Sequence, residues 1–318
     1  MEKGEIVIKR FTKNNSALAG VIEALLLVAL VAIILSIIQM MYIPDIMSVK
    51  ESEHMDVVEN QFSNLKSTIE LQSMMGAVDS DNPAIHSMLS SPITLGSGKL
   101  PYFVTLGARG NVQINDIEDC DHNKIIFNPM TVAEYNDGIP LTSVEYTAYN
   151  HYYLDGKNIK YILEAGAILL NQSSDGEVMK VGPAISVQNI SGDIKIYWDI
   201  PVFICAEGKD ITPTDFKNCY IRTNYTDHDP HNHDDSTSIK IVSEHYVAWY
   251  EYFTSNINGL LYEYLDKYVL VDIVPYDDFD PGSALCVRIR PKDTYDLRVA
   301  ITIVKIGIQT GAGVIQIS

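Results

Sequence analysis

The chain has 318 residues, of which 41 are acidic, 23 are basic and 47% are hydrophobic. The formal net charge of −18 argues against a nucleic-acid partner, because contacts to phosphate need clustered Lys and Arg. Charged residues make up only 20% of the chain and tyrosine occurs 19 times, which excludes wholesale disorder. The composition therefore predicts a folded chain that is long enough to bury a sizeable core.

A long apolar segment follows a short basic one at the N-terminus. The first 20 residues hold four basic and two acidic side chains, and the remaining residues carry a net charge of −20. Residues 17–43 are interrupted only by Glu23, Ser36 and Gln39, and about 20 apolar residues suffice for a helix to cross a bilayer. Because basic flanks stay in the cytoplasm, we predict that the N-terminus is inside and the bulk of the chain is outside.

Three interpretations of this segment compete. A cleaved secretory signal is disfavoured. The apolar region of such signals is shorter than residues 17–43 and is followed by a cleavage site of small residues, and no such site occurs around Pro44. A plain membrane anchor and a helix that packs against other helices both remain. Glu23 bears on the choice, since a carboxylate inside an apolar helix is costly and marks a functional position.

The N-terminal residues resemble type IV pilins and their archaeal pilin-like relatives, which have a short basic leader, a cut beside a small residue and a nearby glutamate. The resemblance implies cleavage after Gly20, a mature chain that begins Val21-Ile22-Glu23, and assembly through these three positions: Gly20, Val21 and Glu23. Short segments farther along are similar to the same largely uncharacterised surface proteins; they lie at 52–55, 61–66, 144–146, 162–170 and 246–253.

Beyond the apolar segment, the periodicity predicts an α+β protein. Met55, Val58, Phe62, Leu65 and Ile69 repeat every three or four residues, as on one face of a helix. The helix either packs on the head or contacts neighbouring subunits, and we expect Gly76 and the turn residues after it to end it. Strand-like segments are expected at 102–104, 124–127, 144–152, 160–170 and 194–204, with a bulge at Gly166, and closing strands at 296–318.

The predicted organisation has four parts and a mainly antiparallel, β-sandwich-like head. They are a basic cytoplasmic leader (1–17), a transmembrane helix (18–43), an amphipathic stalk helix (44–76) and a β-rich extracellular head (77–318). Within the head, we expect one further helix over 242–268 and a polar surface insertion loop over 207–237.

Four cysteines fall in the predicted extracellular part, where disulfides persist. Cys205 and Cys219 flank a short loop, so we pair them locally, which leaves Cys120 to pair with Cys286. The alternative is that some of the four are buried free thiols.

A His-rich cluster and three glycosylation sequons are the remaining candidate sites. His228, His231 and His233 are interleaved with four Asp and could hold a divalent metal, but the spacing fits no rigid template and we favour a solvated acidic loop. The acidic runs 277–280 and 116–119 are weaker candidates for Ca²⁺. The extracellular N-x-S/T sequons are Asn171, Asn189 and Asn224.

No nucleophile elbow, zinc-protease, P-loop or dinucleotide motif occurs, so we predict neither an enzyme nor a cofactor. The predicted function is structural: a pilin-like subunit of an extracellular filament or envelope assembly, with the membrane and further copies of the chain as partners. The alternative is a membrane-anchored binding or adhesion module that never polymerises, and an anchored hydrolase is disfavoured.

Overall fold

A computed structural model describes residues 15–312 of the chain, with short gaps. The gaps are 81, 101–104, 121, 130–134, 136, 174–175, 206–209, 212–217, 234–236, 258, 277–283 and 293. The predicted leader, the strand at 102–104, the acidic run 277–280 and parts of the insertion loop therefore lie outside the described residues, wholly or largely.

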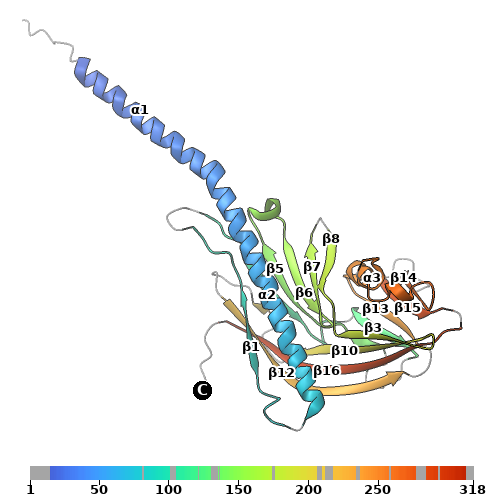
Figure 1. Ribbon diagram of the computed structural model, residues 1–318. Coiled ribbons are helices and arrows are strands. Elements are labelled where there is room, and N and C mark those ends of the chain that lie inside the picture. The colour runs from blue at the N-terminus through green and yellow to red at the C-terminus, as the bar shows by residue number, and fades with distance from the viewer. Residues whose placement is uncertain are drawn as a thin grey trace, which may run out of the picture. The chain divides into compact units, whose positions relative to one another are not determined.

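The predicted fold class is confirmed. The protein is α+β, with a long N-terminal helix, one further short helix and a mostly antiparallel β-rich head (Figure 1). Two compact units are distinguished, residues 1–47 and 48–318. The first unit is helical throughout its described part, and the second holds all the strands.

The helices are few and the strands form three sheets. The helical elements are α1 (Asn15–Ile37), a π-helical turn (Ile38–Tyr42), α2 (Ile43–Val78), α3 (Tyr246–Thr254) and 3-10 turns at Tyr153–Gly156 and Tyr262–Tyr264. The first sheet has the order β1 (Leu89–Thr94), β12 (Asn218–His233), β16 (Leu297–Ala312), β10 (Asp193–Cys205), β9 (Ile185–Ile190). The second has the order β11 (Asp210–Ile211), β2 (Arg109–Asn115), β5 (Ser143–Tyr149), β6 (Ile159–Glu164), β7 (Ala167–Gln172), β8 (Gly176–Val181). The third has the order β14 (Val269–Pro275), β15 (Leu285–Pro291), β13 (Ser238–Val242), β3 (Lys124–Asn128), β4 (Ile139–Pro140).

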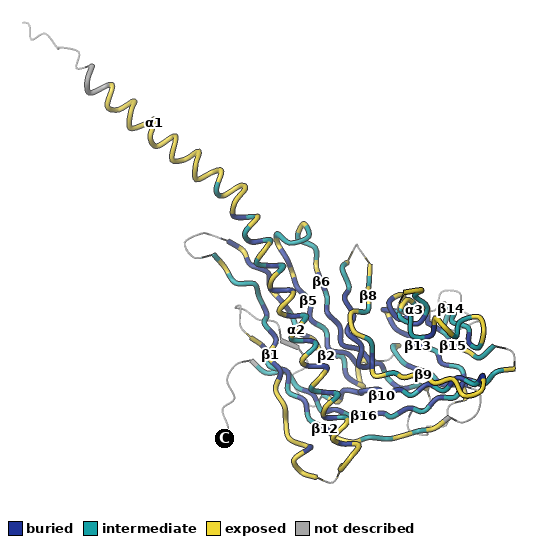
Figure 2. The backbone as a smooth tube through the Cα atoms, in the orientation of Figure 1, coloured by how far each residue is buried: buried dark blue, intermediate teal, exposed yellow. Residues whose placement is uncertain are grey.

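Helix α2 supplies one wall of the first hydrophobic core. Its buried stripe is the predicted one: Met55, Val58, Phe62, Leu65 and Ile69. These side chains pack with buried residues of β1, β2, β5, β6, β7, β12 and β16, so one face of the helix packs against two sheets. Buried and exposed residues alternate along α2 in Figure 2. The part of the stalk that follows residue 47 thus packs on the head of its own chain. This is the first of the two alternatives considered for the helix; the second was contact with neighbouring subunits.

Strands β10 and β16 contribute buried side chains to both hydrophobic cores, one core on each face of the strand pair. They are the parallel pair in an otherwise antiparallel sheet. In β16 the buried positions are odd up to Ile303 and even from Val304, and in β10 the switch falls between Val202 and Phe203. Since alternate side chains point to opposite faces, the early halves pack with α3 and the third sheet, and the late halves pack with α2.

The predicted helix stop at Gly76 is wrong by two residues, since α2 continues to Val78. Gly76 is buried, and a Cβ at this position would lie 2.1 Å from a ring carbon of Tyr225. The glycine is therefore needed for the close approach of a β12 tyrosine to the helix and does not terminate it.

The expected bulge at Gly166 is instead a tight hairpin turn. Residues 160–170, predicted as one strand, form β6 and β7, and the turn consists of Ala165 and Gly166. Both have a positive φ, +46° and +78°, as in the two-residue turns that match the twist of a hairpin. The sequence concealed the turn because an alanine takes the first left-handed position.

The predicted insertion loop 207–237 is wrong over half its length, where β12 forms. Strand β1 pairs only with residues 218–223 of β12, and among the described strands no other pairs with that side of β12, so its remaining part forms an edge of the sheet there. Polar, charged and proline residues at such an edge prevent pairing with other chains. The polar composition that suggested a loop is the composition of this edge.

The helix expected over 242–268 is shorter than predicted. Helix α3 ends at Thr254, and Ser255 takes an extended ψ of 133°. The chain then folds back, because the amides of Leu260 and Leu261 donate to the carbonyls of Tyr252 and Phe253. The closing strand is confirmed as β16.

Candidate functional site

The first unit presents an apolar helix surface that the chain itself leaves uncovered. The large apolar side chains from Val21 to Tyr42 are exposed, with 46–79% of their area accessible, except that of Ile38, which is half-buried. One helix here is long and apolar enough to cross a membrane, and the apolar part of it has no buried residue. Such a surface requires lipid or other helices around it, which is compatible with membrane anchoring.

The predicted assembly residues lie on this surface. Gly20, Val21 and Glu23 are all exposed, and no atom outside the helix's own backbone lies within 4 Å of a Cβ built on Gly20. Ser36 differs from Glu23, because its hydroxyl donates to the carbonyl of Ala32 at 2.8 Å and is satisfied within the helix. Glu23 is thus an exposed ionisable side chain on an otherwise apolar helix surface.

A buried carboxylate fastens α2 to the head. Glu51 has no accessible surface, and its oxygens accept from the backbone N–H groups of His151, Tyr152 and Tyr153 at 2.7–3.2 Å. These amides converge in the connection between β5 and β6. A carboxylate that accepts several backbone N–H bonds is held as an anion would be in a protein anion site.

Two further side chains of the same helix, His54 and Glu59, make polar contacts with the head. The ring of His54 and the hydroxyl of Tyr146 lie 3.0 Å apart, and burial lowers the pKa of His54 to about 4. Glu59 accepts from the hydroxyl of Tyr161 at 2.9 Å and pairs with Lys180 at 3.3 Å. The helix face that meets the second sheet is thus polar at its margins and apolar at its centre.

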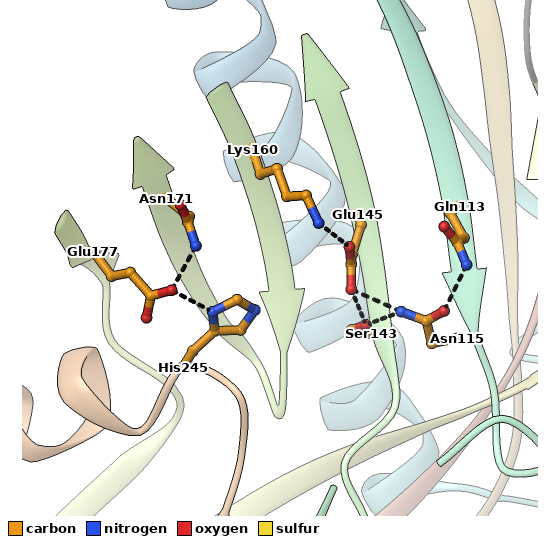
Figure 3. Close-up of polar contacts among 8 residues, drawn as sticks. All are labelled: Gln113, Asn115, Ser143, Glu145, Lys160, Asn171, Glu177 and His245. Carbon is orange, nitrogen blue, oxygen red and sulfur yellow. Dashed lines mark hydrogen bonds and ion pairs between the residues drawn. The ribbon is translucent and has the colours of Figure 1, made fainter. Parts of the chain in front are cut away.

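A row of polar side chains crosses the other face of the second sheet (Figure 3). It runs from Gln113 and Asn115 on β2, through Ser143 and Glu145 on β5 and Lys160 on β6, to Asn171 on β7 and Glu177 on β8. At its end, Glu177 contacts the imidazole Nδ1 of His245 at 3.0 Å. The contacts form two groups: one links β2, β5 and β6, and the other links β7 and β8 to the segment that begins α3 (Figure 3).

Glu164 forms a second link between the same two parts of the head. This fully buried carboxylate accepts from the hydroxyl of Ser243 at 2.9 Å and from the indole N–H of Trp249 at 2.7 Å. Burial raises the pKa of Glu164, and the nearby His245 and the two hydrogen bonds oppose the rise. Burial lowers the pKa of His245, but the hydrogen bond to Glu177 and the charge of Glu164 outweigh it, so that pKa lies above its ordinary value.

The imidazole of His245 should make head stability depend on pH. A raised pKa means that protonated His245 contributes stability in full below the unfolded-state value of about 6.5, and that this contribution is lost as the pH rises through the folded-state pKa. We expect His245→Asn to flatten the fall in Tm above pH 6.5. The matched control is His122→Asn, because His122 is exposed. Equal slopes of Tm against pH in the wild-type protein and both variants would contradict the expectation.

The structure contains neither of the predicted disulfides among its four described cysteines. Cys205 ends β10 and Cys219 begins β12, and β16 lies between these strands. Two strand spacings amount to about 10 Å, which exceeds the ~7 Å limit between the Cα atoms of a disulfide. The sequence placed the pair at the ends of a short loop, whereas the strands they occupy are not neighbours. Cys120 donates to the carbonyl of Leu141 at 3.0 Å, and Cys286 is buried.

The His-rich cluster is divided between the two faces of a strand. In the β12–β16 register, His228 lies opposite Val304 and His231 lies opposite Ile301, which face different cores. His228 contacts the hydroxyl of Tyr225 at 2.6 Å, and His231 pairs with Asp229 at 2.9 Å. Among the described side chains, which exclude that of His233, no group of three potential metal ligands converges. The described residues therefore do not support the predicted metal site.

The three sequons differ in accessibility. Asn171 is half-buried and donates to Glu177, and the side-chain oxygen of half-buried Asn224 lies 2.4 Å from where a Cβ on Gly307 would stand. Asn189 is exposed on β9, an edge strand, and its side chain accepts from the amide of Gly192 at 3.0 Å. Glycosylation stays a prediction, and Asn189 offers it the most accessible acceptor of the three.

Comparisons with protein-family models, with curated proteins and with solved structures find no match to this chain. The site therefore has to be interpreted from its own geometry. Sequence reasoning missed two buried carboxylates, Glu51 and Glu164. Glu164 had an available signal, because it is the single carboxylate in the predicted strand 160–170, whereas Glu51 is one of several acidic residues in its helix and had none.

Proposed function

We propose that this chain is a membrane-anchored, pilin-like surface protein that serves as a structural subunit of an extracellular filament or envelope assembly. The proposal rests above all on one observation: the helix surface between Val21 and Tyr42 is apolar and uncovered, yet it carries the ionisable Glu23. A lone anchor needs the apolar surface but gains nothing from the carboxylate. An assembly of such helices has a use for both.

The head supports a structural role in a second way. Helix α2 is built into the first core and held there by the Glu51 carboxylate, so force on the helix is transmitted to a rigid β-rich body. The four predicted parts of the chain are those of a pilin-like design. The head is proposed to lie outside the cell, and Asn189 is its proposed glycosylation site.

The alternative is an anchored binding or adhesion module that never polymerises. It uses the same helix as an anchor, so the two proposals differ in the fate of the leader and in self-association. Accessible glycosylation fits both equally and does not separate them.

Topology and processing give the direct test. Protease added to intact cells should digest residues 48–318, because the basic flank keeps the N-terminus inside. N-terminal sequencing of the native protein should begin at Val21 if the leader is removed for assembly. Met1 at the N-terminus of an externally exposed protein would favour the anchored module, and a head protected in intact cells would contradict both proposals.

A further inference from the structure

A pocket of about 300 Å³ lies within the head, between α2, the β6–β7 hairpin and β10. Its apolar floor consists of Ile69, Leu163, Phe203 and Val304, each of which has at most 3% of its surface accessible to water. Phe203 and Val304 are the first residues at which β10 and β16 face the first core. The pocket therefore lies where the strands change from one core to the other.

The size and the apolar floor of the pocket suit a small apolar body. An apolar cavity of about 150 Å³ is sufficient to bind benzene in another protein, so this pocket has room for one ring with a short substituent. Pockets of this size that combine apolar walls with a few converging polar groups are the usual sites of small ligands.

Charged groups define the polar side of the pocket. Lys66 is 7% exposed and forms an ion pair with Glu70, one turn later on α2. Asp199, on β10, lines the pocket from the strand side and is exposed. The three formal charges sum to −1, and no cationic side chain among the described residues pairs with Asp199, so the wall favours a cation over an anion.

We propose that this pocket binds a small amphiphile with an apolar body and one positive charge, such as an aromatic or short alkyl amine. The body occupies the floor between Ile69 and Phe203, and the ammonium group lies against Asp199. This binding is independent of whether the chain forms filaments.

The test uses three probes with the same ring and different charge, namely 4-fluorobenzylamine, 4-fluorobenzyl alcohol and 4-fluorobenzoate. Each is titrated into the full chain in lipid nanodiscs, and binding is followed by fluorine NMR of the probe. We expect the amine to bind most tightly and the carboxylate most weakly. Asp199→Asn should weaken the amine about threefold, the scale of one solvent-exposed charge pair, and leave the alcohol unchanged.

A filling variant separates the pocket from the lipid and from the rest of the surface. Ser73→Trp adds a large side chain at the pocket wall and should abolish binding of all three probes, whereas Ala77→Trp, exposed one turn later and outside the lining, should not. Wild-type protein that binds none of the probes, binding that survives Ser73→Trp, or an equal affinity for amine and carboxylate would each overturn the proposal.

Discussion

Glu23→Leu should leave the chain in the membrane and stop its assembly. On insertion scales, a charged residue at the centre of a membrane helix costs about 2.5–3.5 kcal/mol, so the substitution should not impair insertion and should favour it. Assembly depends on the carboxylate for a different reason. If the leader is cut after Gly20, the new α-amino group of Val21 is a cation among packed apolar helices, and Glu23 of an adjacent copy can pair with it.

The expected loss follows from the cost of an unpaired buried charge. Removing one partner of such a pair typically destabilises by about 3–5 kcal/mol, enough to lower an association constant by roughly two to nearly four orders of magnitude. Membrane fractionation measures insertion, and electron microscopy with sedimentation of sheared material measures assembly. Ser36→Leu is the matched control, because Ser36 is satisfied by the carbonyl of Ala32 and its loss should leave assembly intact.

Two outcomes would decide against a filament subunit. If Glu23→Leu still assembles, the carboxylate has no role in pairing. If the wild-type protein never assembles while its N-terminus is Met1, the anchored-module proposal takes its place.

Glu51→Ala should destabilise the head by about 3–5 kcal/mol in the free energy of unfolding. The substitution removes the acceptor of three backbone N–H groups, those of residues 151–153, and each buried donor left without a partner costs about 1–3 kcal/mol. Water that enters the vacated space recovers part of this cost. Since Glu51 fixes α2 to the β5–β6 connection, its loss should also loosen the contact between helix and head.

Denaturant unfolding of the full chain in nanodiscs, followed by tryptophan fluorescence, measures this change. Both tryptophans, Trp198 and Trp249, are buried in the head and report on its unfolding. Glu53→Ala is the matched control: Glu53 is exposed two residues later on the same helix, so we expect a change below about 0.5 kcal/mol. Equal effects of the two substitutions would show that the Glu51 contacts contribute nothing to stability.

Several features could be predicted from the sequence because their signals are local. The apolar run around Glu23, the stripe from Met55 to Ile69 and the alternation in β16 each follow from a period of 3.6 or 2 along the chain. The α+β class follows from the change of period between them.

Features that depend on neighbours distant in the sequence were mispredicted. The polar stretch of β12 looked like a loop because its partner β16 lies some 70–90 residues later, as the pairing of Cys219 with Ala312 and of His233 with Val299 shows. The Cys205–Cys219 bridge failed for the same reason, since β16 inserts between the two strands.

The sequence by itself determined an uncovered apolar helix followed by an amphipathic one and a β-rich head. The spacing of apolar residues along a single helix or strand shows which of its faces is buried. Only the tertiary structure decided that Glu51 receives three backbone amides, that Glu164 and His245 join the second sheet to α3 and the segment before it, and that Lys66, Glu70 and Asp199 border one pocket. These contacts join residues tens to about 130 positions apart. Their formation depends on how the sheets stack, and no short-range pattern in the chain encodes that stacking.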